Sequence, residues 1–205
     1  MKRFFVEHTK FPTPLHIKNA ISNSAEYTSY QKEILWVGDI SPHKGLQNII
    51  STIDDIARQH QWQVTVVGDG PLRNELTSLY PNVRFIGYAD PKVQYLSASI
   101  FVMSSICWEN CPTVVLEAMQ YGLCVIGNNL AGIEEIVLHG QTGLLYNSVD
   151  ELGSLLSRTI NDPTFTKTLG QAGRSFVTNE YPWSQCVASY CHLYQKLINS
   201  DIRNT

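Results

Sequence analysis

Two glutamates near an expected helix start are the residues of this chain best suited to chemistry. Glu109 and Glu117 are separated by seven residues in the stretch ENCPTVVLE. Pro112 fits the first position of a helix, because its missing N–H costs nothing there. We therefore expect Glu109 in a loop and Glu117 on the following helix, whose free backbone N–H groups would suit a phosphate.

Glu117 has only apolar residues beside it, in the run VVLEA. A carboxylate in such surroundings is costly unless a partner satisfies it, and a pair of ligand hydroxyls would do so. The alternative is a solvated helix carboxylate beside a surface loop. The residues by themselves leave both interpretations open.

The rest of the chain alternates between short apolar runs and amphipathic stretches. The apolar runs predict strands at 34–37, 63–67, 83–86, 100–103, 123–126 and 143–146. Besides the helix that carries Glu117, the pattern predicts helices at 46–60, 71–80, 93–97, 133–138, 150–160, 164–178 and 183–199, the last three packing on the sheet. Strands that alternate with helices imply parallel βαβ units, so we predict an α/β fold with a doubly wound, Rossmann-like sheet. Such sheets bind ligands in the loops that leave the carboxyl ends of their strands.

Residues 1–32 differ from the remainder. The segment 10–14 contains two prolines, and 22–31 is polar with no strong period. We interpret residues 1–32 as a linker or the remnant of a neighbouring N-terminal domain, with a disordered leader as the alternative. Residues 33–205 then form the main domain.

The composition excludes several classes of protein. A formal net charge of −3 and a pI near 6.0 argue against sequence-independent binding to nucleic acid. No apolar run approaches the roughly 20 residues that span a bilayer. Glu7 and His8 interrupt the N-terminal stretch where a signal peptide would be apolar, so we expect a cytoplasmic protein.

The five cysteines form no CxxC pair. Cys107 and Cys111, together with scattered histidines, could suggest zinc, but their spacing matches no common zinc site. We expect reduced thiols and no metal or other cofactor.

The stretch around Glu109 and Glu117 resembles the E-x7-E signature of retaining group 1 (GT4-type) glycosyltransferases, which have the GT-B fold. In that family the first glutamate meets the donor sugar and the second holds the ribose of the nucleotide. The resemblance implies that Glu109 is the catalytic residue and that Glu117 binds the nucleotide sugar. It covers roughly residues 34–183, where several weaker family motifs occur in the family's order.

These weaker motifs imply further contacts to the nucleotide sugar. Gly38 and Lys44-Gly45 resemble a loop that grips the donor diphosphate, and Gly68-Asp-Gly-Pro resembles a glycine turn whose first role is structural. Gly132 belongs to a loop similar to the family's G-G-x-P-E. The resemblance thus implies a binding set of Gly38, Lys44, Gly68, Cys111, Pro112, Thr113, Val114, Glu117 and Gly132.

One position departs from the family pattern. Asp39 stands where the family has an arginine that helps to bind the diphosphate. Because a carboxylate repels a diphosphate, this substitution bears on the affinity for the donor.

The motifs all belong to the C-terminal, donor-binding half of a GT-B enzyme, so the resemblance implies a missing acceptor domain or partner chain. It implies transfer of a sugar from a UDP- or GDP-type donor to a glycan or lipid-linked acceptor, and allows peripheral membrane association of the full enzyme. The alternatives are a non-catalytic nucleotide-sugar-binding subunit, a GT-B-type nucleotide-sugar epimerase, and an unrelated Rossmann-like binding protein.

Overall fold

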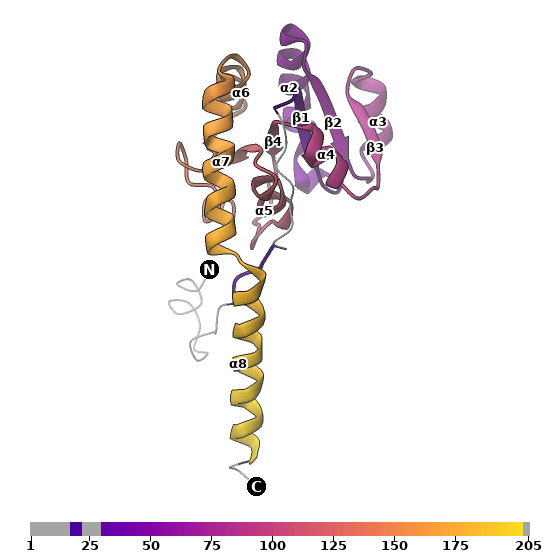
Figure 1. Cartoon of the computed structure of the whole chain (residues 1–205). Helices are drawn as coiled ribbons and strands as arrows, with labels where there is room; N and C mark the ends of the chain where they lie inside the picture. Colours follow the sequence, from indigo (N-terminus) through magenta and orange to yellow (C-terminus); the bar gives the residue numbers. More distant parts are fainter. Residues whose placement is uncertain (1–16, 22–29, 203–205) are drawn as a thin grey trace.

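A single parallel sheet of six strands organises the chain (Figure 1). The structure is a computed structural model and describes residues 17–21 and 30–202. The strands are β1 (Glu33–Val37), β2 (Gln63–Val67), β3 (Arg84–Gly87), β4 (Ile100–Met103), β5 (Cys124–Asn128) and β6 (Leu144–Tyr146). Their order is β3-β2-β1-β4-β5-β6, and every neighbouring pair is parallel. The predicted doubly wound, Rossmann-like sheet is therefore confirmed.

The strand order reverses between β1 and β4, which are hydrogen-bonded neighbours in the middle of the sheet. The chain winds outward from β1 to β3 on one side and from β4 to β6 on the other. Loops that leave β1 and β4 consequently diverge, and a crevice opens between them at the carboxyl edge of the sheet.

Helices cover both faces of the sheet. They are α2 (Leu46–His60), α3 (Arg73–Leu79), α4 (Lys92–Ser97), α5 (Thr113–Gln120), α6 (Val149–Asn161) and α7 (Pro163–Glu180), with a short 3-10 helix η1 (Pro42–Lys44). One hydrophobic core joins α2, α3 and α6 to the sheet, and a second joins α4, α5 and α7. Successive residues of β1 divide between them, since Ile34 and Trp36 enter the first core and Leu35 enters the second.

Two predicted helices differ from the structure. Residues 133–138 form successive turns, with Ile136 N–H and Val137 N–H both donating to the carbonyl oxygen of Ile133. The last helix, α8 (Trp183–Ile202), extends away from the sheet, whereas the sequence pattern predicted that it packs there (Figure 1). Several of its apolar residues, including Tyr194 and Leu197, are exposed, so the helical period of the sequence did not show whether the helix packs on the sheet.

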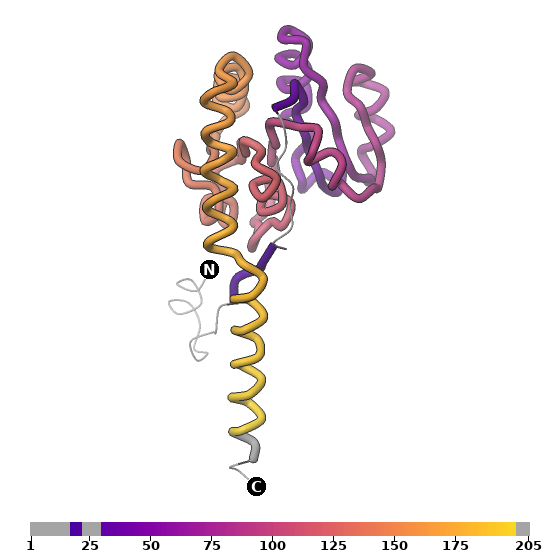
Figure 2. Tube along the Cα trace, in the orientation of Figure 1, coloured from indigo at the N-terminus to yellow at the C-terminus, as the bar shows by residue number. Residues whose placement is uncertain are grey.

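The segment 17–21 lies beside the junction of α7 and α8 (Figure 2). Ile21 pairs with Pro182, and its N–H donates to the carbonyl oxygen of Tyr181 at 3.1 Å. The Lys18 ammonium lies 2.9 Å from the Glu180 carboxylate. The other residues of 1–32 that the sequence marked as a linker, apart from 30–32, lie outside the described residues.

Gly132 is required by a close approach between two loops. Its φ of 89° is left-handed, and a Cβ placed on it would lie 1.7 Å from the carbonyl oxygen of Glu109. The loop after β5 thereby packs against the loop that carries Glu109. A side chain larger than hydrogen at this position would force the two loops apart.

We expect Gly132→Ala to destabilise the fold more than Gly140→Ala. Both glycines have left-handed backbone, which costs alanine about 1–2 kcal/mol, but a Cβ at Gly140 meets nothing within 4 Å. The clash at Gly132 should add about 1–3 kcal/mol. Urea unfolding of both variants measures the difference. Equal losses would contradict the close approach of the loops.

Candidate functional site

A cleft of about 780 Å³ lies at the carboxyl edge of the sheet, beside the point where the strand order reverses. Its walls come from the ends of β1 and β2, the segment after β3, and the first turns of α5. The lining residues are Val37, Gly38, Asp39, Val67, Gly68, Asp69, Gly70, Tyr88, Ala89, Asp90, Pro91, Val114 and Glu117. Four of the predicted binding residues therefore share this cleft: Gly38, Gly68, Val114 and Glu117.

The floor of the cleft depends on contact between two backbone segments. Gly38 N–H donates to the carbonyl oxygen of Val67 at 3.0 Å, and Ile40 N–H donates to that of Asp69 at 2.7 Å. Gly68 has a φ of 140°, and a Cβ there would lie 1.8 Å from the carbonyl oxygen of Gly38. The glycine turn after β2 thus brings the loop after β1 close to β2 and leaves backbone exposed to a ligand.

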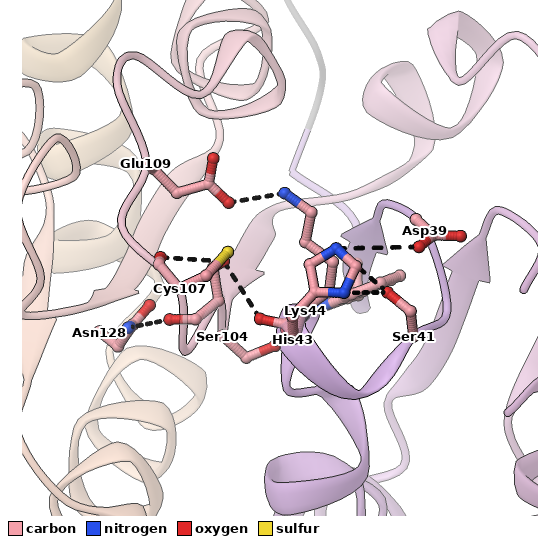
Figure 3. Close-up of polar contacts among 10 residues, drawn as sticks. Asp39, Ser41, His43, Lys44, Ser104, Cys107, Glu109 and Asn128 are labelled. Carbon is pink, nitrogen blue, oxygen red and sulfur yellow. Dashed lines mark hydrogen bonds and ion pairs between the residues drawn. The ribbon is translucent and has the colours of Figure 1, made fainter. Parts of the chain in front are cut away.

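Lys44 and Glu109 form an ion pair across the crevice (Figure 3). Lys44 Nζ lies 2.6 Å from Glu109 Oε1, with 26% and 14% of the two side chains exposed. Lys44 ends η1 in the loop after β1, and Glu109 belongs to the loop after β4. A charge pair this sheltered from solvent is screened less than a surface pair, so each group orients the other.

Hydrogen bonds to β1 and between the two loops fix the loops that carry this ion pair. Trp36 Nε1 donates to Ser104 Oγ at 3.0 Å, and Ser104 Oγ donates to the carbonyl oxygen of Lys44 at 2.8 Å. Ile106 N–H donates to the carbonyl oxygen of His43 at 2.9 Å. On the other side, Asn128 Nδ2 donates to the carbonyl oxygen of Ser105 at 2.5 Å (Figure 3).

Glu117 has a buried tyrosine as its partner. Tyr95 on α4 donates its hydroxyl to Glu117 Oε2 at 3.0 Å and stacks on Tyr121 at a ring distance of 5.2 Å. The pKa of the Glu117 carboxyl is raised, mainly by burial. The hydrogen bond from Tyr95 lowers this pKa, and the nearby charge of Asp90 raises it. Burial also raises the pKa of Tyr95, so the phenol stays a hydrogen-bond donor.

The cleft is lined by four carboxylates: Asp39, Asp69, Asp90 and Glu117. Asp69 Oδ2 accepts a bond from Arg73 Nη1 at 3.1 Å, and Asp90 Oδ1 accepts one from the N–H of Lys92 at 3.0 Å. Asp39 lies 4.0 Å from the imidazole of His43. Neither Lys44 nor Arg73 is among the lining residues, so an anionic ligand in this cleft would need to reach cations beyond the lining, such as Lys44 in the loop of Asp39 or Arg73 beside Asp69.

Other predicted binding residues lie elsewhere. Cys111 and Gly132 line a second cleft of about 510 Å³ with Asn19, Phe176 and Tyr181. Burial is the largest effect on Cys111 and raises the pKa of its thiol. Within the part of the chain that the structure describes, the linings of these two clefts do not include Pro112 or Thr113.

The sequence predicted Pro112 as the first residue of the helix, whereas in the structure Pro112 is the N-cap of α5. Its extended ψ of 109° and buried ring set the entry angle of the chain, and Thr113 begins the helix. Pro112 accepts bonds through its carbonyl oxygen from Val115 N–H at 3.1 Å and Leu116 N–H at 3.4 Å. The N–H groups that remain at the start of α5 are therefore those of its first two residues.

Sequence reasoning missed Tyr88 and Tyr95. Tyr88 is 93% exposed at the rim of the cleft, and an aromatic residue directly after a strand that ends in glycine was an available signal. Tyr95 is almost fully buried and reaches Glu117 from another helix. No spacing in the sequence indicates that contact.

Among the residues that the structure describes, no three histidine, cysteine, aspartate or glutamate side chains form a group that could hold a metal ion. All five cysteines are free thiols. Over 17–21 and 30–202, none of the helices combines the length and apolar character needed to span a bilayer.

The fold is that of a Rossmann-like α/β domain with a cleft at the carboxyl edge of its sheet, and comparison with known proteins defines the class further. A sequence profile described as "Glycosyl transferases group 1" matches residues 31–162. This match covers more than half of the chain. The chain belongs to the group 1 glycosyltransferase family.

Similar sequences come from several microorganisms. The chain is 26% identical to an uncharacterized glycosyltransferase of Methanocaldococcus jannaschii, over 89% of this chain and 58% of that protein. It is 30% identical to a GDP-mannose-dependent monoacylated α-(1-6)-phosphatidylinositol monomannoside mannosyltransferase of Corynebacterium glutamicum, over 81% of this chain and 48% of that protein. The chain spans about half the length of the curated relatives it matches.

Solved structures share the fold. Sucrose-phosphate synthase from Thermosynechococcus elongatus superposes with a TM-score of 0.82 at 24% identity, over 97% of this chain and 56% of that one. Anabaena HepE in complex with UDP gives a TM-score of 0.69 at 21% identity, over 82% and 49%. The C-terminal domain of a group 1 family protein from Francisella tularensis gives 0.66 at 22% identity, over 77% and 88%. These likenesses establish the GT-B type of Rossmann-like domain.

We expect Tyr95→Phe to lower the free energy of unfolding by about 1–2 kcal/mol at about pH 8, where Glu117 is ionised and loses a donor. The loss should shrink as the pH falls towards about 5, because a growing fraction of Glu117 is protonated and needs that donor less. The direction of this pH dependence follows from the pKa of Glu117, which is raised in the folded protein and which loss of the Tyr95 hydroxyl raises further. Urea unfolding at both pH values measures the effect.

The same substitution made in a Glu117→Gln background is the matched control. Without an ionisable group at position 117, the loss should no longer depend on pH. A loss that keeps its pH dependence in that background would show that Tyr95 does not act through Glu117.

Proposed function

We propose that this chain is the donor-binding half of a retaining glycosyltransferase that uses a UDP- or GDP-type nucleotide sugar. The observation that carries the proposal is the position of Glu117, which lines a cleft at the switch point of the sheet and has a fixed hydrogen-bond partner. Ligands of open α/β sheets bind at this place. A carboxylate held there can accept bonds from both ribose hydroxyls.

The donor would lie along the cleft with its nucleoside near Glu117 and its diphosphate towards Lys44. Tyr88 at the rim offers an aromatic face for the base. The ammonium of Lys44 would bind the phosphates, and its ion pair with Glu109 would turn that carboxylate towards the sugar. Lys44 also stabilises the negative charge that the nucleoside diphosphate gains when its bond to the sugar breaks.

The names of similar proteins support a nucleotide-sugar donor without choosing between the two bases. The Anabaena neighbour was solved in complex with UDP, and the Corynebacterium relative is named as dependent on GDP-mannose. We propose a glycan or lipid-linked acceptor.

The domain division also belongs to the proposal. Residues 33–205 would form the nucleotide-sugar-binding domain, and residues 1–32 a linker to an acceptor domain or partner chain. The family match begins at residue 31, which agrees with this boundary. A non-catalytic nucleotide-sugar-binding subunit remains the second candidate, and the acidic lining of the cleft favours it. Transfer of radiolabelled sugar by the complete enzyme, and its loss in Glu109→Gln, separates the two.

Glu117→Ala should weaken binding of both uridine and UDP, or of their guanine equivalents, by about 1.5–3 kcal/mol, the value of a hydrogen bond to a charged group. Isothermal titration calorimetry measures the change. Glu75→Ala on α3 is the control, since this exposed glutamate does not line the cleft. Unchanged affinity in Glu117→Ala would contradict the assignment of the ribose site.

Lys44→Met should separate the diphosphate from the nucleoside. Binding of UDP should weaken by about 1.5–3 kcal/mol because a charged donor is lost, whereas binding of uridine should stay within twofold, or about 0.4 kcal/mol. Lys92→Met on α4 removes a lysine outside the cleft lining and serves as the control. Equal losses for UDP and uridine would place the phosphates away from Lys44.

A further inference from the structure

In the loop after β1, Asp39 stands where the family pattern has an arginine, and His43 follows four residues later. Asp39 lines the cleft, and its Oδ2 lies 4.0 Å from Nε2 of His43. Ser41 Oγ lies 3.1 Å from Nδ1 of the same ring, so the imidazole is held between the two (Figure 3). About half of the His43 side chain and half of the Asp39 side chain remain exposed and open to a ligand.

Several charged or titratable groups surround this imidazole. From its own loop these are Asp39 and Lys44, and Lys44 is paired with Glu109 from the loop after β4. The loop after β4 also brings Ser105, whose Oγ lies 3.4 Å from the carbonyl oxygen of His43 and 3.2 Å from the thiol of Cys107.

The loop after β2 contributes Asp69, which lines the same cleft as Asp39 and is paired with Arg73. Thus the lysine of this loop and the nearby arginine each already have a carboxylate partner. His43 is the histidine of this loop, and histidine is the residue type that serves most often as a proton-dependent charge.

We propose that protonated His43 supplies the positive charge that an arginine would otherwise give to the donor diphosphate, so that binding of the donor takes up a proton. This inference rests on the proposed function, because it needs a nucleotide sugar in the cleft. With neutral His43, Asp39 leaves an uncompensated negative charge beside the phosphates. With protonated His43, the pair is neutral and its cation can turn to the ligand.

The direction of the pH dependence follows from linkage. An anionic ligand favours the protonated imidazole, so the bound state holds the proton to a higher pH than the free state. Affinity is therefore greatest below the titration of free His43 and falls as the pH rises through the titration of the complex.

The test is the affinity of the chain for UDP-glucose and GDP-mannose at about pH 8 and about pH 6. Each phosphorus of a nucleotide sugar has one ester bond and shares the bridging anhydride oxygen, so neither probe has the second phosphate ionisation found near about pH 6 in a monoester. The wild-type chain should bind the better probe about three- to tenfold more tightly at the lower pH, within the limit of tenfold per pH unit for one proton. His43→Gln should remove most of this gain.

Three further binding measurements separate the contribution of His43 to this pH dependence from other contributions. His192→Gln, on the exposed α8, should keep the wild-type dependence. Asp39→Asn should bind more tightly than wild type at the higher pH and gain less on acidification, because the repulsive charge is gone. Uridine and guanosine lack the diphosphate. Any pH dependence in their binding therefore reports the contribution of Glu117, whose pKa is raised.

A direct reading comes from the imidazole Cε1–H resonance of His43 in the wild-type chain, assigned by its absence in His43→Gln. Added nucleotide sugar should move its titration to higher pH. Tight binding with an unchanged His43 titration and an unchanged pH dependence in His43→Gln would overturn the inference and leave the proposed function standing. Failure of both nucleotide sugars to bind at either pH would overturn both.

Discussion

The ion pair between Lys44 and Glu109 is the interaction on which the arrangement of the site depends. It joins the loop after β1 to the loop after β4 at the point where the strand order reverses. Those two loops would otherwise diverge, because the chain winds in opposite directions from β1 and β4. The pair sets both the separation of the crevice walls and the direction of the catalytic candidate. A phosphate that enters must share Lys44 with Glu109.

Backbone packing supports the same geometry from the neighbouring loops. The turn at Gly68 presses against Gly38, and Gly132 presses against Glu109, each at a distance that excludes a Cβ. The indole of Trp36 supports the same loops through Ser104. The polar groups of the cleft are consequently placed before any ligand arrives, which lowers the cost of ordering them on binding. The excess of carboxylates is the unusual feature, and it makes the few cations at the edge decisive.

Much of the fold could be predicted from the sequence. Short apolar runs indicate the strands, stretches with a helical period indicate the helices, and glycine turns separate them in the order of βαβ units. The six strands lie within a residue or two of their predicted positions. Residues 133–138 were mistaken for a helix because isolated turns and a short helix share the same apolar spacing. The place of α8 could not be predicted, since several of its apolar residues are exposed and the helical period does not say on which surface the helix packs. At the site, spacing indicated Glu109 and Glu117, whereas the contacts with Lys44 and Tyr95 arise from elements distant in sequence.

A crystal structure of the chain with UDP-glucose or GDP-mannose would test the central claim most directly. The expected result is the nucleoside in the cleft beside Tyr88, both ribose hydroxyls on the carboxylate of Glu117, and the diphosphate within hydrogen-bond distance of Lys44. The sugar should then lie next to Glu109. A nucleotide bound with its ribose away from Glu117, or one that occupies the second cleft beside Cys111, would contradict the assignment of this edge of the sheet as the donor site.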